Sequence, residues 1–291
     1  MNYLRVAIAQ ISPTLGDVES NLEAHLSYIH EAREKRVQLL LFPELSLTGY
    51  NLAARSIEVA LWKDAPSILT LAQAAGEMHV VVGFVEEGAA AQFYNSCAVV
   101  HQNEVVYLHR KLNLATYGNL EEGKYYGTGR CVETILIGGP PWRGSILICA
   151  DLWNPALVYL AALHGTTILM APTSSALDSV SSEFSNLRGW DLATRYYAMM
   201  YGMPILLGNR VGVEGDMQFW GGSQVIDPFG NPIATAENES EQLIVADLDY
   251  ELVRRARHQL PTVRDSNLAL VAREIRRTEE YSGIPPFRKT T

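Results

Sequence analysis

The sequence predicts an α/β protein, because short runs rich in Val, Ile and Leu alternate with longer segments of helical period. Its 291 residues, 48% of them hydrophobic, are enough for one large core or two smaller ones. The chain carries neither an internal repeat nor a low-complexity linker. We therefore expect a single domain over residues 1–260, followed over residues 261–291 by a tail without regular period. This tail either packs on a surface or on a second subunit, or is disordered.

Strands and helices alternate through the first half of the chain, until a hairpin breaks the order. Asp17 can cap the first helix, which turns Leu22, Leu26 and Ile29 to one face. The expected elements are a strand at 5–9, the helix that follows Asp17, a strand at 37–42, a helix at 67–77, a strand at 79–85, and a hairpin of 94–101 with 104–109 across Gln102-Asn103.

The second half begins with a strand that ends at Cys149. The segment 227–232, Asp-Pro-Phe-Gly-Asn-Pro, has the composition of a tight turn between two strands. The other expected elements are a helix at 155–164, a strand at 167–170, a helix around 182–201, and strands at 205–207 and 243–248.

Composition and charge exclude several classes of protein. A net charge of −9, with Lys and Arg scattered, argues against nucleic acid or an anionic membrane as the partner. Cys97, Cys131 and Cys149 are odd in number and lack CxxC spacing, which fits neither a disulfide framework nor a zinc knuckle. The seven histidines show no metal-binding spacing, so we expect no metal and no cofactor. No apolar run reaches the roughly 18 residues of a membrane span and the first strand starts almost at once, so we expect a cytoplasmic protein.

Cys149 is the most informative residue. The sequence Ser-Ile-Leu-Ile-Cys-Ala-Asp-Leu-Trp-Asn-Pro at 145–155 is a β-branched apolar run that ends at a thiol, with a helix-compatible segment beyond. A strand-to-helix turn of this kind lifts a nucleophile above a sheet edge, where free helix amides face the group that it attacks. A buried structural cysteine is the alternative.

Two other strand ends carry complementary chemistry. Glu44 follows the strand at 37–42, and Lys111 follows the hairpin strand at 104–109. A carboxylate can take the proton of a thiol, and an ammonium can stabilise the oxyanion formed when sulfur attacks a carbonyl or nitrile carbon. Each residue alone is more typical of a solvated loop. A cysteine–histidine hydrolase that uses His164 would leave both residues unexplained.

These residues and their surroundings resemble the nitrilase, or carbon-nitrogen hydrolase, superfamily over nearly the whole chain. The motifs that carry the resemblance are Phe42-Pro43-Glu44-Leu45 with Thr48-Gly49-Tyr50, Arg110-Lys111-Leu112, Cys149-Ala150-Asp151 with Pro155, Asn209-Arg210-Val211-Gly212, and Phe219-Trp220-Gly221-Gly222-Ser223. The resemblance implies an α-β-β-α sandwich. It further implies Glu44 as general base, Lys111 as oxyanion-stabilising cation, Cys149 as nucleophile and the Ala150 amide as second oxyanion donor.

A second, local resemblance is to the glutaminase domain of glutamine-dependent NAD synthetases. It rests on the segment from Lys111 to Glu122 and on Trp153-Asn154-Pro155. It implies that Glu122, or the adjacent Glu121, hydrogen-bonds the lysine, and that Tyr117 touches the substrate. Trp153 and Thr173 are further expected binding residues. Ala150 stands where those domains carry an acidic residue, and no adenylating domain follows, so we do not expect this chain alone to make NAD.

We therefore expect a hydrolase that cleaves a small primary carboxamide to acid and ammonia through a cysteine thioester. Two alternatives stay open at this point. One is a nitrilase, since the same thiolate attacks a nitrile carbon. The other is a glutaminase-like subunit that delivers ammonia to a partner synthetase. The family resemblance also implies a homo-oligomer.

Overall fold

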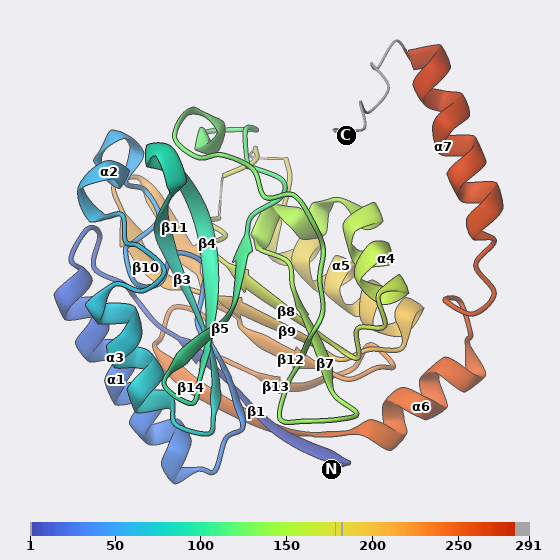
Figure 1. Cartoon of the computed structure of the whole chain (residues 1–291), viewed down its shortest axis with the longest axis horizontal. Helices are drawn as coiled ribbons and strands as arrows, with labels where there is room; N and C mark the ends of the chain where they lie inside the picture. Colours follow the sequence, from blue (N-terminus) through green and yellow to red (C-terminus); the bar gives the residue numbers. More distant parts are fainter. Residues whose placement is uncertain (1, 178, 182, 283–291) are drawn as a thin grey trace.

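Two mixed six-stranded sheets form the centre of the computed structural model (Figure 1), which describes residues 2–177, 179–181 and 183–282. The first sheet pairs β1–β2–β3 in parallel and adds β14, β4 and β5 antiparallel. Its order is β14 (Gln242–Asp249), β1 (Tyr3–Gln10), β2 (Leu39–Leu41), β3 (His79–Gly88), β4 (Gln92–His101) and β5 (Glu104–Arg110).

The second sheet has parallel strands β7, β8 and β9 at its centre and antiparallel strands at both edges. Its order is β13 (Pro232–Thr235), β12 (Gln224–Ile226), β9 (Ile205–Asn209), β8 (Ile168–Thr173), β7 (Arg143–Ile146) and β6 (Ile135–Leu136). A separate ribbon pairs β10 (Val211–Glu214) with β11 (Met217–Trp220).

Helices cover the outer faces of both sheets (Figure 1). Helices α1 (Val18–Glu34) and α3 (Pro66–Ala75) lie over the first sheet, and α4 (Pro155–Leu163) and α5 (Asn186–Tyr201) lie over the second. The remaining helical segments are α2 (Ser56–Val59), α6 (Tyr250–Gln259), α7 (Leu268–Ser282) and the short 3₁₀ turns η1 (Ala53–Arg55), η2 (Ala89–Ala91), η3 (Glu122–Lys124) and η4 (Cys149–Trp153).

The layers follow from the period of two in the strands. Val6 and Ile8 on β1 pack into the core between the two sheets, whereas Ala7 and Ala9 pack against the helices of the first sheet. Small alanines on the helical side let α1 approach the sheet closely, and branched residues fill the space between the sheets. The predicted α-β-β-α sandwich is therefore confirmed.

Most predicted elements are present, with ends that differ by a few residues. The Asp17 carboxylate caps α1 by accepting from the Ser20 amide at 3.0 Å. The hairpin of β4 and β5 turns at Gln102 and Asn103, both with positive φ. The predicted helix around 182–201 begins at Asn186, and Ser182 lies outside the described residues. The second strand spans only Leu39–Leu41, because the chain then turns to present Glu44.

The expectation of a tail without regular period is wrong for residues 268–282, which form α7. Leu268, Val271 and Ile275 recur at helical spacing, and the Asn267 side chain accepts from the Leu270 amide at 3.0 Å at the start of the helix. In Figure 1, α7 stands away from the sandwich. Its contact with a second subunit stays a prediction, and residues 283–291 lie outside the described residues.

Candidate active site

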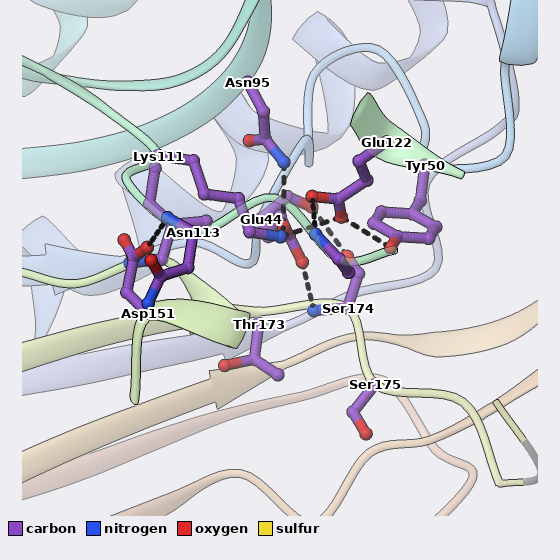
Figure 2. A network of polar contacts seen from close by, with 12 residues as sticks. Glu44, Tyr50, Asn95, Lys111, Asn113, Glu122, Asp151, Thr173, Ser174 and Ser175 are labelled. Carbon is purple, nitrogen blue, oxygen red and sulfur yellow. Dashed lines mark hydrogen bonds and ion pairs between the residues drawn. The ribbon is translucent and has the colours of Figure 1, made fainter. Parts of the chain in front are cut away.

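Four titratable side chains reach one site from different parts of the fold. Glu44 follows β2, Lys111 follows β5, Cys149 opens η4 after β7, and Glu122 opens η3. Strand ends at one edge of a sheet lie close in space even when they are far apart in sequence. Glu44, Lys111 and Glu122 are accordingly in direct contact, as Figure 2 shows.

The Lys111 ammonium is held between two carboxylates. Its Nζ donates to Glu44 Oε1 at 2.5 Å and to Glu122 Oε1 at 2.7 Å. Lys111 and Glu44 are 0% exposed and Glu122 is 6% exposed, so water contributes little to their solvation. Since buried charges are costly unless they are paired and hydrogen-bonded, this cluster has to be fixed by its surroundings.

Glu44 receives two further hydrogen bonds. Asn95 Nδ2 donates to its Oε1 at 2.8 Å, and the Ser174 amide donates to its Oε2 at 2.9 Å. The Ser174 hydroxyl also donates to the Glu44 carbonyl oxygen at 2.8 Å. Both carboxylate oxygens of Glu44 are therefore aimed by the protein (Figure 2).

Glu122 is fixed in a similar way. The Tyr50 hydroxyl donates to its Oε1 at 2.6 Å, and the Ala115 amide donates to its Oε2 at 2.9 Å. The neighbouring Glu121 is exposed and pairs with Lys124 instead. The lysine contact thus belongs to Glu122, which decides between the two adjacent glutamates.

A glycine makes room for the turn that carries Glu44. A Cβ on Gly83 of β3 would lie 2.4 Å from the Leu45 nitrogen and 2.6 Å from the Pro43 oxygen. Any other residue would collide with backbone atoms that cannot move away easily. The Leu47 amide donates to the Gly83 oxygen at 2.9 Å, which fastens the turn to the strand.

Cys149 is buried and sits in a left-handed turn. Its φ is +44°, an uncommon value for a residue with a Cβ. Burial raises the pKa of its thiol well above the usual value, and Glu44 adds to the rise, while Lys111 and the Ser174 amide oppose it. The sulfur is therefore protonated at rest at neutral pH.

The charges of the cluster also perturb one another. Burial raises the pKa of Glu44, Lys111 opposes that rise, and Glu122 adds to it. Burial alone would lower the pKa of Lys111, but Glu122 and Glu44 together raise it well above the usual value. Lys111 therefore stays a cation.

The four expected binding residues differ in burial and in contacts. Tyr117 is half-buried, and burial together with Cys149 raises the pKa of its phenol. Ala150 is buried beside Cys149, and the half-buried Trp153 ring lies 4.5 Å from the Trp190 ring. Thr173 is fully buried, and its hydroxyl donates to a carbonyl in its own strand. The binding roles of these four residues stay predictions.

Tyr50, Asn95 and Ser174 also contact the cluster, although they are not among the site residues predicted from the sequence. Tyr50 lies in the Thr48-Gly49-Tyr50 motif, which is a signal, whereas Ser174 directly follows β8 only because that strand extends past its predicted end at residue 170. Asn95 is a polar residue within β4, with no local feature that marks it as a partner of Glu44.

Two features are absent from the part of the chain that the structure describes. No group of three or more His, Cys, Asp or Glu side chains there is placed to hold a metal ion. None of the helices in that part of the chain is long and apolar enough to cross a membrane.

The α-β-β-α sandwich with buried acid, lysine and cysteine side chains places the protein in the class of nitrilase-type hydrolases. The carbon-nitrogen hydrolase family model matches residues 5–258, and the chain belongs to this family. The resemblance inferred from the motifs is thereby confirmed, and the protein is a carbon-nitrogen hydrolase of the nitrilase superfamily.

Individual relatives differ in named function. The glutamine-dependent NAD(+) synthetase of Thermotoga maritima is 31% identical over 86% of this chain, which spans only 43% of that relative. A probable nitrilase of Schizosaccharomyces pombe, C965.09, is 29% identical over 84% of this chain and 89% of its own length. Among solved structures, a double mutant of the amidase from Nesterenkonia sp. AN1 in complex with acrylamide has a TM-score of 0.80 at 22% identity. That match covers 94% of this chain and 97% of the amidase.

Proposed function

We propose that the protein is an amidase that hydrolyses a small primary carboxamide to the acid and ammonia through a thioester on Cys149. The observation that carries this proposal is the buried Lys111 ammonium, bonded to both Glu44 and Glu122, in electrostatic contact with the Cys149 thiol. A base, a nucleophile and an oxyanion stabiliser are the three groups that acyl transfer needs. Membership of the carbon-nitrogen hydrolase family also supports cleavage of a C–N bond.

In the first half-reaction, Glu44 takes the proton of the Cys149 thiol as sulfur bonds to the carboxamide carbon. The carbonyl π electrons move to oxygen, and the oxyanion is stabilised by Lys111 Nζ and the Ala150 amide. When the C–N bond breaks, Glu44 returns its proton to the nitrogen. Ammonia leaves, and the acyl group stays on sulfur as a thioester.

In the second half-reaction, water attacks the thioester carbon and Glu44 takes one of its protons. The same two donors stabilise the second oxyanion. The C–S bond then breaks, sulfur recovers the proton from Glu44, and the carboxylic acid is released. Atoms and charges balance without a metal or a cofactor.

The pKa shifts fit this sequence of proton transfers. The raised pKa of Glu44 makes it a stronger base than a solvated glutamate. Glu122 keeps the lysine charged and aimed, because it accepts from both Lys111 and the Tyr50 hydroxyl.

Two other substrates have specific support. A nitrile is supported by the similarity to the probable nitrilase, which matches over most of both chains. Glutamine, with a partner synthetase that receives the ammonia, is supported by the similarity to the NAD(+) synthetase. In each case the Cys149 sulfur attacks first. The substrates differ in whether the attacked carbon belongs to a carboxamide or to a nitrile.

The test is ammonia release by the purified protein from a panel of primary amides, glutamine and nitriles. Cys149→Ala is expected to abolish release, and Cys131→Ser, which changes an exposed cysteine, serves as the matched control. Release that survives in Cys149→Ala contradicts the proposal. Acid formed only from nitriles supports the nitrilase, and release that requires an added synthetase supports the glutaminase-like subunit.

We also propose a cytoplasmic homo-oligomer. Free thiols at Cys97, Cys131 and Cys149 support a reducing compartment. Exposed apolar residues on α7, among them Leu268 and Ile275, support a contact with a second copy. Light scattering of the full chain tests the oligomer, and a monomer at all concentrations contradicts it.

A further inference from the structure

The proposed mechanism leaves one fully buried carboxylate without a role. Asp151 is 0% exposed and lies two residues after Cys149. Its Oδ1 accepts from the Leu112 amide at 3.0 Å and from the Asn113 amide at 2.6 Å. These two amides directly follow Lys111, so one carboxylate oxygen holds the segment that carries the ammonium (Figure 2).

The second oxygen of Asp151 holds the segment that carries the thiol. Its Oδ2 accepts from the Ile148 amide at 2.9 Å, and the Asp151 amide donates to the Ile148 oxygen at 3.0 Å. These two bonds close the turn around Cys149, whose φ of +44° lies in the sparsely populated left-handed region. The Asp151 side chain therefore also stabilises the turn that carries Cys149.

Asp151 has no oxygen free for chemistry on a substrate. Three backbone amides occupy it, and His109 Nε2 lies 3.6 Å from its Oδ2. Hydrogen bonds to a buried carboxylate from two separate segments fix those segments relative to each other. Lys111 and Cys149 come from different sheets, and among the described residues Asp151 bonds directly to the backbone beside both.

We propose that Asp151 is a positioning residue that sets the Lys111 ammonium against the Cys149 sulfur, so that the oxyanion forms within reach of both. This inference rests on the proposed function. It predicts a specific kinetic defect, because the steps that form an oxyanion depend most strongly on Lys111 being in place.

Two reactions of the same sulfur separate positioning from general damage. Amide hydrolysis passes through an oxyanion and requires the Lys111 ammonium to lie close to that oxyanion. Alkylation of Cys149 by chloroacetamide displaces chloride at a saturated carbon and forms no oxyanion. A residue that positions Lys111 should therefore affect hydrolysis much more than alkylation.

The main variant is Asp151→Asn, made in a Cys131→Ser background that removes the exposed thiol. The amide oxygen of Asn can still accept from Leu112 and Asn113, but its NH₂ group then meets the Ile148 amide, donor against donor. We expect kcat to fall on the order of 100-fold with KM little changed, since a displacement near 1 Å has an effect of this size. Alkylation at Cys149, followed by peptide mass spectrometry, should fall far less.

Glu86→Gln is the matched control. Glu86 is also buried, but it accepts from side chains, namely the Ser96 hydroxyl at 2.7 Å and Arg110 Nε at 2.8 Å, and from no backbone amide beside Lys111 or Cys149. If loss of any buried carboxylate impairs the enzyme, both variants will lose activity alike, and the inference fails. We expect Glu86→Gln to keep a kcat close to wild type for each folded molecule.

Each remaining outcome is decisive. Hydrolysis and alkylation that fall in parallel, or a kcat for Asp151→Asn equal to wild type, overturn the positioning role. If Asp151→Asn does not fold, Asp151→Glu keeps the charge, shifts the oxygens and is judged by the same difference between the two reactions. A wild-type protein that hydrolyses no compound of the panel contradicts the proposed function itself, which is a different result.

Discussion

Two buried clusters bring a cation against carboxylates, and they differ in charge balance. Lys111 contacts two carboxylates, Glu44 and Glu122, whereas Arg210 pairs with Glu214 alone. Both cations are almost completely buried. The first cluster carries one more negative than positive charge when fully ionised, and the second is neutral.

The neutral pair has the features of a structural ion pair. Glu214 Oε2 also accepts from the Tyr50 amide at 3.1 Å and from the Asn51 amide at 2.7 Å. The Arg210 guanidinium lies 4.2 Å from the centre of the Phe219 ring. The charges of Arg210 and Glu214 balance, and both carboxylate oxygens of Glu214 accept hydrogen bonds. The pair is therefore not suited to exchanging a proton.

The cluster of Lys111, Glu44 and Glu122 has unequal charges and is suited to exchanging a proton. Two carboxylates near one ammonium repel each other, and this repulsion is part of why the pKa of Glu44 is raised. Since both clusters are buried, an excess of negative charge distinguishes the cluster that is suited to proton transfer. The two are also linked, because Glu214 holds the Tyr50 backbone while the Tyr50 hydroxyl holds Glu122.

The largest expected effect is on stability, at the neutral pair. Arg210→Met leaves Glu214 buried without its cation, and we expect a loss of about 3–5 kcal/mol in the free energy of unfolding. Urea denaturation measures it. The double variant Arg210→Met with Glu214→Gln should recover part of the loss. A single variant as stable as wild type would show that the pair is not structural.

The next effect is on activity, at the unequal cluster. Lys111→Ala removes the proposed oxyanion stabiliser, and we expect kcat to fall about 10²- to 10³-fold while the fold survives. Steady-state kinetics and circular dichroism together check it. Lys124→Ala, which removes an exposed lysine paired with Glu121, is the control and should keep full activity. Near-wild-type turnover in Lys111→Ala would refute the assignment.

A smaller effect is expected at the link between the clusters. Tyr50→Phe removes a hydrogen bond to a charged carboxylate, worth about 1.5–3 kcal/mol, so kcat should fall at least about tenfold. The ring still packs against Phe219, which should preserve stability. Tyr126→Phe is the matched control, since that buried tyrosine bonds to Ser56. Equal losses in both variants would mean that the Tyr50 hydroxyl has no special role.

The smallest effect is a shift in pH dependence. Glu44 acts as a base in its ionised form, so activity should be lost as pH falls through its pKa, which burial raises above the usual value for a glutamate. Glu122→Gln removes a negative charge that raises this pKa. The acidic limb of the kcat/KM profile should therefore move to lower pH in Glu122→Gln. A limb that stays in place or moves up would show that Glu122 does not influence Glu44.

Local signals in the sequence predicted most of the fold. Alternation in the strands, the Asp17 cap and the Gln102-Asn103 turn are properties of neighbouring residues, and the structure has them where expected. Helix α7 was missed because its apolar face is narrow and interrupted by many charges.

The candidate site was less evident. Glu44, Lys111 and Cys149 were found because each lies at or within a few residues of the end of a strand. Glu122 came only from the resemblance to known proteins, and Asn95 was not found, because its contact with Glu44 depends on how β4 lies beside β3. Contacts of this kind depend on tertiary packing and leave no local trace.

The close packing at Gly83 has a consequence for mutational studies. It has no side chain and takes no part in any proposed proton transfer, yet a single added carbon would strike the backbone on both sides of Glu44. In a survey of all single substitutions, selection for activity should treat this position as strictly as the nucleophile. Intolerance to mutation would there report the space that a reactive group requires, at a residue with no reactive atom of its own.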